Sequence, residues 1–171
     1  MKTQIISFED LANYEGSVLA YGHFTTIHPG HIRFLRYAKK RGEKLLVALM
    51  DDVIENNVPK FKFNQVDRAE SLSLISIADA IIPLKGNQIK EVAEIIKPKL
   101  FVLGKQFAID HEPTLNSTIK LFESNGTPIE YASGDMNFGS ADLLSHSEKE
   151  LYEKRKNEFN YACTRQNIDI N

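Results

Sequence analysis

Five short apolar runs alternate with helical patterns along this chain, and this alternation constrains the fold more than any other feature. The continuous apolar run at 45–50 is typical of a strand buried on both faces of a sheet. Strands that alternate with helices form a parallel sheet, and right-handed crossovers place the helices on both of its faces. We therefore predict an α/β fold with five parallel strands, at residues 18–21, 45–50, 80–84, 100–103 and 129–132.

The helical spacing of apolar residues predicts the helices. They are expected at residues 8–14, 31–41, 65–77, 87–96 and 111–124. The segment 51–63 carries two asparagines, a proline and alternating lysines and phenylalanines, so it is expected to be an irregular loop. Beyond the last strand, a serine-capped helix start at 140–144 precedes a charged helical stretch at 147–161. We divide the chain into a domain at 1–145 and a C-terminal helical tail at 146–171.

The first expected strand runs into Gly22, and His28-Pro29-Gly30-His31 follows at the start of a helix. Proline suits the first helical turn, where its missing N–H costs nothing. A strand, a glycine turn and a helix N-terminus in this order make a site for an anion. Two histidines three residues apart lie on one face of a helix and can touch the same bound group.

This stretch resembles the H-x-G-H signature of the cytidylyltransferase-like nucleotidyltransferases. In that family the preceding residues read glycine, any residue, phenylalanine and aspartate; Thr25 stands here in place of the aspartate. The resemblance covers residues 17–144, and its further matching segments are 63–70, 78–82, 98–104 and 134–140. It implies a Rossmann-like sheet with strand order 3-2-1-4-5, which places residues 22–31 beside 103–107.

The resemblance also implies the reaction. The most similar subgroup acts on phosphorylated sugars or polyols and includes heptose-phosphate adenylyltransferases and glycerol-phosphate cytidylyltransferases. We expect transfer of CMP, with AMP as the second choice, from CTP or ATP to a sugar or polyol phosphate, with release of pyrophosphate, for surface-polysaccharide synthesis. Mg²⁺ is expected because a triphosphate needs charge neutralisation. No cluster of carboxylates in the sequence identifies the ligands of the metal.

Each candidate residue has a role in this interpretation. His28 and His31 are expected to donate hydrogen bonds to the α-phosphate, and Lys60 and Lys62 to close over the β- and γ-phosphates. Contacts with the nucleotide are expected from Tyr21, Gly22, His23, Phe24, Thr25, Gly30, Arg68, Gly104 and Ser140.

Simpler structural roles compete with these functional ones. The two histidines would merely cap a helix, and Arg68 would form an ion pair on its helix. The two lysines would belong to a solvated loop, and Ser140 would only cap its helix.

Composition sets the remaining limits. A chain of 171 residues with 42% hydrophobic and 26% charged residues is an ordinary globular domain. A net charge of −2 gives no attraction to nucleic acid, and no apolar run is long enough to span a bilayer. The single cysteine, Cys163, makes a reducing cytoplasm the simplest setting, and the N-terminus has no signal-peptide pattern.

The family resemblance adds two expectations about partners, because relatives are often dimers and some carry a fused sugar kinase. A homodimer is therefore expected, and a sugar kinase is a candidate partner. Two other functions stay open: a nucleotide-binding regulatory domain that has lost turnover, and an adenylyltransferase of cofactor biosynthesis. Pyrophosphate release would separate the enzymes from the binding domain.

Overall fold

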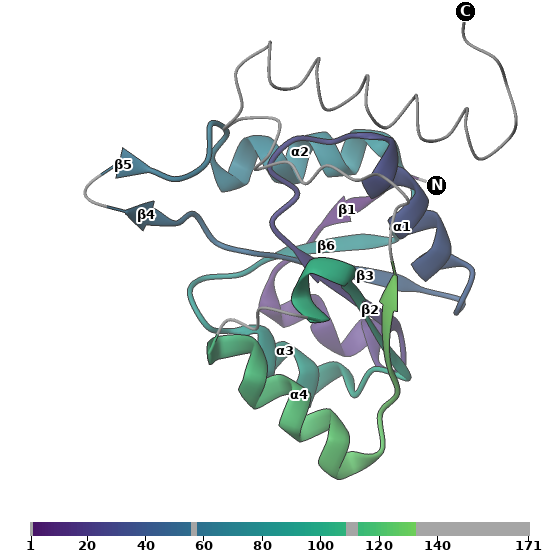
Figure 1. Cartoon of the computed structure of the whole chain (residues 1–171). Helices are drawn as coiled ribbons and strands as arrows, with labels where there is room; N and C mark the ends of the chain where they lie inside the picture. Colours follow the sequence, from purple (N-terminus) through teal and green to yellow (C-terminus); the bar gives the residue numbers. More distant parts are fainter. Residues whose placement is uncertain (1, 56–57, 109–112, 133–171) are drawn as a thin grey trace, which may run out of the picture. The chain divides into compact units, whose positions relative to one another are not determined.

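One parallel sheet runs through the part of the chain that the structure, a computed structural model, describes: residues 2–55, 58–108 and 113–132, all within the unit Met1–Met136. Its strand order is β1-β6-β3-β2-β7-β8 (Figure 1). The strands are β1 Gln4–Ile5, β2 Val18–Gly22, β3 Leu45–Leu49, β6 Ala80–Pro83, β7 Leu100–Gly104 and β8 Ile129–Ala132.

Helices cover both faces of this sheet (Figure 1). They are α1 Pro29–Lys39, α2 Gln65–Ile75, α3 Ile89–Ile96 and α4 Pro113–Asn125, with 3₁₀ helices η1 Phe8–Tyr14 and η2 Lys105–Ala108. Successive strand residues enter different cores, because side chains alternate across a strand. Val18 of β2 packs in one core with Leu72 of α2, whereas its neighbour Leu19 packs in the other with Phe122 of α4. The sheet is therefore buried on both faces.

The expected order of the five strands is confirmed, and the reversal of direction in the strand order falls between β2 and β7. The sequence analysis missed β1, a strand of only two residues that pairs with β6 at the edge of the sheet. Gln4 N–H donates to Asp79 O at 3.1 Å, and Ile6 N–H donates to Ile81 O at 2.9 Å. A two-residue strand has no periodicity from which it could be predicted.

Of two further elements, one matches expectation and one differs from it. The expected helix at 8–14 is present, and it is of the 3₁₀ type. The expected irregular loop at 51–63 contains a short antiparallel hairpin, β4 Ile54–Glu55 and β5 Val58–Pro59. Ser140, the helix start at 140–144 and the tail at 146–171 lie outside the described residues.

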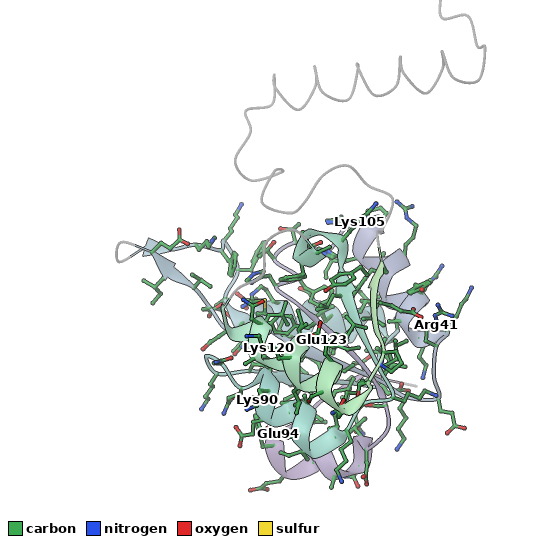
Figure 2. All side chains as sticks on the ribbon, turned by 60° about the horizontal axis from the view of Figure 1, so that its bottom comes forward. Arg41, Lys90, Glu94, Lys105, Lys120 and Glu123 are labelled. Atoms are coloured by element: carbon green, nitrogen blue, oxygen red, sulfur yellow. The ribbon has the colours of Figure 1, made fainter. Side chains whose placement is uncertain are left out.

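Surface ion pairs lie away from the site, and Figure 2 labels three of the residues that form them, Arg41, Lys90 and Glu94. Arg41, just beyond α1, binds Glu130 of β8 at 2.9 Å and so ties this helix to the edge strand. Lys90 and Glu94 pair at 3.6 Å along one face of α3. Within the described ranges, no helix is both long enough and apolar enough to cross a membrane.

Candidate nucleotide site

The turn between β2 and α1 shapes the site. Phe24 adopts a φ of +50°, a left-handed conformation that is uncommon for a residue with a side chain. Its ring packs against His31 and Phe34, with centroid distances of 5.1 and 6.2 Å. A Cβ atom on Gly22 would lie 3.1 Å from the Phe24 ring. Glycine at position 22 therefore lets the ring of Phe24 fold back over the end of β2.

His28 caps the helix that follows. It has an extended backbone, and its Nδ1 accepts the Gly30 N–H at 3.1 Å. In the neutral ring the proton then lies on Nε2, which is available as a donor. The imidazoles of His28 and His31 stack with their centroids 3.9 Å apart and their planes at 27°. The structure thus brings together the two histidines that the sequence analysis placed at the α-phosphate.

Both rings are held in the uncharged form. Burial, and then the neighbouring His28, lower the pKa of His31 from 6.5 to about 4, against a smaller opposing effect of a hydrogen bond with the Thr26 backbone. Burial, and then the charge of Arg33, lower the pKa of His28. Two neutral imidazoles can stack closely, whereas two imidazolium ions would repel each other. At neutral pH the pair therefore offers N–H donors at the start of α1 without a positive charge of its own.

Aromatic rings connect the end of β2 to the segments on either side of it. The His23 ring lies 4.8 Å from Phe61 and 6.5 Å from Phe107, and Phe107 also packs on Tyr21 at 5.7 Å. Burial, then Arg68 and Lys60, lower the pKa of His23 to about 4. Since Phe107 belongs to η2, these contacts confirm that residues 22–31 lie beside 103–107.

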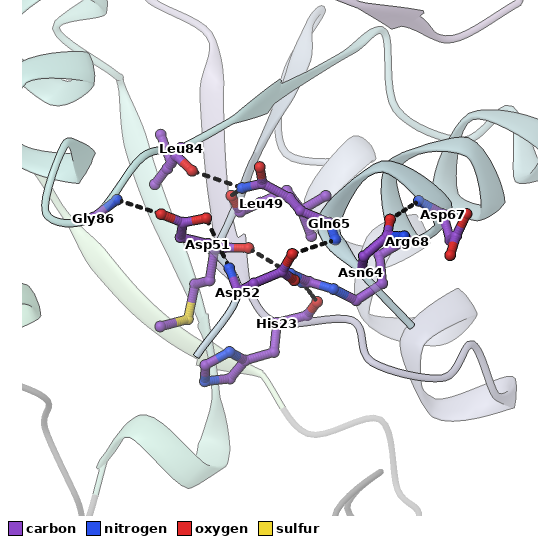
Figure 3. A network of polar contacts seen from close by, with 11 residues as sticks. His23, Leu49, Asp51, Asp52, Asn64, Gln65, Asp67, Arg68, Leu84 and Gly86 are labelled. Atoms are coloured by element: carbon purple, nitrogen blue, oxygen red, sulfur yellow. Dashed lines mark hydrogen bonds and ion pairs between the residues drawn. The ribbon is translucent and has the colours of Figure 1, made fainter. Parts of the chain in front are cut away.

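Arg68 is the centre of a polar network at the ends of β2 and β3 (Figure 3). Its side chain is 1% exposed. Nη1 donates to the carbonyl of His23, and Nη2 donates to Met50 O at 3.0 Å and Asp52 Oδ1 at 2.8 Å. The two terminal nitrogens are thus bound to protein oxygens. The expected contact between Arg68 and the nucleotide stays a prediction.

Two adjacent carboxylates extend this network. Asp52 Oδ2 accepts the backbone N–H of Gln65, the first residue of α2, at 3.0 Å. Asp51 Oδ2 accepts the Gly86 N–H, and its Oδ1 accepts the Asp52 N–H, both at 2.8 Å. The Gln65 amide donates to Leu84 O at 2.6 Å. The carboxylates are therefore engaged with protein donors rather than gathered around an empty metal position.

The sequence analysis did not single out Asp51, Asp52 and Gln65. The sequence feature that could have identified them is the pair Asp51 and Asp52, which directly follows the buried apolar run at 45–50. Polar residues at the carboxyl ends of parallel strands lie at the edge where such folds bind ligands.

The two predicted lysines lie on the segment that follows β5. Lys60 forms an exposed ion pair with Glu55 at 2.8 Å, and Lys62 is exposed. On the other side of β2, Gly104 ends β7, and a Cβ there would lie 2.5 Å from the Gln106 side-chain oxygen. The expected contacts of these residues with the nucleotide stay predictions.

Thr25, which replaces the aspartate of the family pattern, is 7% exposed. It lines a cavity of about 360 Å³ between the turn and α2, whose walls are completed by Phe24, Thr26, Ile27, Phe63, Arg68, Ser71 and Leu74. Among the described residues, no group of three or more histidine, cysteine or acidic side chains could hold a metal ion.

Comparison with known proteins agrees with this geometry. Residues 19–159 match the family model described as Cytidylyltransferase-like. The FAD synthase of Thermoplasma volcanium is 35% identical over 104 residues, which are 60% of this chain and 72% of that protein. The bifunctional protein HldE of Azotobacter vinelandii is 30% identical over 110 residues, which are 62% of this chain and only 23% of HldE.

Solved structures show the same fold. The lipopolysaccharide core biosynthesis protein from Thermoplasma volcanium superposes with a TM-score of 0.52 at 24% identity, covering 67% of this chain and 92% of that one. Pantothenate synthetase from Thermus thermophilus gives a TM-score of 0.56 at 11% identity, covering 88% of this chain and 70% of that one. With a family match over most of its length, and the histidine pair of the signature stacked beyond β2, the chain belongs to the cytidylyltransferase-like family and is a nucleotidyltransferase.

Proposed function

We propose that the protein transfers a nucleoside monophosphate from a nucleoside triphosphate to the phosphate group of a small acceptor. One observation carries the proposal: the stacked pair His28 and His31 lies at the N-terminus of α1, directly beyond the carboxyl end of β2. Open α/β sheets bind ligands at this edge, where the strand order reverses, and a helix N-terminus favours phosphate.

The reaction exchanges one phosphorus–oxygen bond for another. An oxygen of the acceptor phosphate attacks the α-phosphorus, and the bond to the bridging oxygen breaks, so that its electron pair leaves with pyrophosphate. His28 Nε2–H and the imidazole of His31 would donate hydrogen bonds to the α-phosphate oxygens as their charge rises. Because the pKa values of both rings are lowered, each ring is neutral at neutral pH and would donate through its one N–H group.

Relatives favour AMP over CMP as the transferred group. The proteins named FAD synthase make a product that contains AMP, and further ones from Archaeoglobus fulgidus and Ferroglobus placidus are each 34% identical to this chain. They also favour a flavin phosphate as acceptor, which corresponds to the cofactor-biosynthesis alternative. A sugar or polyol phosphate is the second candidate, favoured by the HldE match.

The triphosphate brings several negative charges, and the described residues offer exposed lysines to meet them. Bound Mg²⁺ would neutralise part of the charge on the leaving pyrophosphate. Lys60 would reach the β- and γ-phosphates by exchanging its carboxylate partner, Glu55, for them. An exposed ion pair of this kind is worth only about 0–1 kcal/mol, so the exchange costs little.

The test is a matrix of nucleotides and acceptors. ATP and CTP are each incubated with riboflavin 5′-phosphate, a heptose phosphate and glycerol phosphate; pyrophosphate is measured, and products are identified by mass spectrometry. We expect one ATP combination to give stoichiometric pyrophosphate and product. His28→Ala and His31→Ala should each lower kcat by about 10²–10³, by analogy with the loss of one oxyanion donor.

Two results would contradict the proposal. Undiminished product formation by the double alanine variant would remove the histidine pair from the reaction. Nucleotide binding without turnover for any acceptor in the matrix would instead favour the regulatory domain.

A further inference from the structure

A buried arginine joins the ends of two neighbouring strands. Arg68 donates to the carbonyl groups of His23 and Met50, which directly follow β2 and β3. His23 is the first residue after Gly22, so Arg68 binds the chain where the turn toward His28 begins. The Arg68 side chain is 1% exposed, so its guanidinium is buried.

Asp52, in the segment that follows β3, holds this arginine of α2 in place. One carboxylate oxygen accepts from Arg68 Nη2 at 2.8 Å, and the other accepts from the Gln65 N–H at 3.0 Å. Asp52 therefore fixes the start of α2 and the direction of the guanidinium with the same side chain (Figure 3). The carboxylate is 39% exposed, whereas its partner is buried.

We propose that Asp52 and Arg68 are positioning residues, which set the place of the turn at 23–28, and hence of the histidine pair, relative to the end of β3. This inference rests on the proposed function. It gives Arg68 a positioning role instead of the contact with the nucleotide that the sequence analysis expected. Three N–H groups on the terminal nitrogens of Arg68 already bind protein oxygens, so a phosphate could bind these groups only by displacing those oxygens. The Nε atom is buried without a hydrogen-bond partner.

The same guanidinium supports the lysine-bearing segment. The Phe61 ring lies 5.3 Å from the Arg68 carbon and 4.8 Å from the His23 ring. Phe61 stands between Lys60 and Lys62 in the sequence. One buried cation thus contacts both the turn that carries the histidines and the segment that carries the lysines.

The geometry requires arginine in particular. A guanidinium is planar and sends N–H groups in several directions, whereas an ammonium is a single point charge on a flexible stem. Arg68→Lys keeps the charge but cannot reach the carbonyls of His23 and Met50 and the Asp52 carboxylate with the same alignment. Asp52→Asn keeps one acceptor and loses the charge that pairs with the arginine.

The experiment compares Arg68→Lys and Asp52→Asn with Asp51→Asn. Asp51 is a matched control because it follows the same strand and accepts two backbone N–H groups without touching Arg68. We expect the first two variants to lower kcat by about 10–100-fold, because misplacement of reacting groups by an ångström costs up to about 10² in rate. The KM for the nucleotide should change by less than about threefold, since no group that binds it is removed.

Amide hydrogen exchange provides a readout that does not depend on turnover. The amides of residues 23–27 should exchange faster in Arg68→Lys and Asp52→Asn than in the wild type, and at the wild-type rate in Asp51→Asn. If the wild-type chain transfers no nucleotide, the proposed function fails, and this exchange pattern still decides the positioning role.

Two outcomes would overturn the inference. In one, Arg68→Lys and Asp52→Asn lower kcat no more than Asp51→Asn does, and exchange is unchanged. In the other, the nucleotide KM rises at least tenfold in Arg68→Lys while kcat is kept, which would make Arg68 a nucleotide ligand as the sequence analysis expected. Asp52→Asn decides the question if Arg68→Lys does not fold, because its side chain has the same size as the native one.

Discussion

The proposed function gives His28 two roles in one side chain. Its Nδ1 caps α1 by accepting the Gly30 N–H, and its Nε2–H is proposed to donate to the α-phosphate. The structural and the functional roles that the sequence analysis set against each other are therefore compatible. They use different nitrogens, so a substitution can separate them.

We expect His28→Asn to separate capping from catalysis. Asparagine is a good helix cap, so this variant should keep its free energy of unfolding, whereas His28→Ala should lose about 1 kcal/mol. Both should lower kcat by about 10²–10³, because both lack the Nε2 donor. Urea unfolding and pyrophosphate release measure the two effects. If His28→Asn kept wild-type turnover, His28 would be a cap alone.

Two depressed histidine pKa values make the stability depend on pH. His23 and His31 have pKa values of about 4 in the folded chain and an ordinary value of 6.5 when unfolded. Between these values the unfolded chain binds protons that the folded chain does not, so stability falls as the pH falls from 6.5 to about 4. Above 6.5 the stabilising contribution is fully present.

The expected loss between pH 7.5 and pH 5 is about 2–4 kcal/mol for the two groups together. The free energy of unfolding in urea is measured at pH 7.5, 6 and 5 for the wild type and for the double variant His23→Gln, His31→Gln. Titrating carboxylates contribute equally to the two proteins, so the difference between their slopes isolates the two histidines. The variant should show a flatter dependence. Equal slopes would mean that these rings are not buried in the neutral form.

At the scale of elements, the segment between β3 and α2 was the least predictable. Local sequence patterns were sufficient to predict the five longer strands. They also predicted the turn into α1, because the strand, the glycine and the proline that define it lie close together in the sequence. They were not sufficient for the contacts of Arg68 with His23 and Asp52, which join residues 45 and 16 positions apart. The strand order came from the family resemblance, because no local pattern specifies which strands pair.

A substitution at Phe61 tests whether the segment between β3 and α2 buries the ring of His23. Phe61→Ala removes a ring that contacts His23, and burial is the largest cause of the low pKa of His23. We therefore expect the pKa of His23 to rise from about 4 toward 6.5, as followed by NMR titration of its ring. Phe63→Ala is the control, because Phe63 is 43% exposed and lines the cavity beside Arg68 instead. An equal pKa rise in both variants would show that the segment as a whole moves.

At the scale of the whole molecule, the reversal between β2 and β7 divides the sheet into two halves. One half is β1, β6, β3 and β2, and the other is β7 and β8. A nucleotide bound beyond the ends of β2 and β7 would contact segments from both halves. Binding should therefore stabilise the described unit as a whole rather than one loop.

Thermal unfolding with nucleotides tests this coupling. A ligand that binds only the folded chain stabilises it by RT ln(1 + [L]/Kd), which is about 2.7 kcal/mol at 100 times Kd. With Mg²⁺ present, we expect ATP to raise the melting temperature by several degrees and CTP by less. The wild type and the double variant His28→Ala, His31→Ala are compared at the same ATP concentration, and the variant should lose most of the shift. A full shift in that variant would place the triphosphate away from the histidine pair, and an equal shift with CTP would remove the preference for AMP.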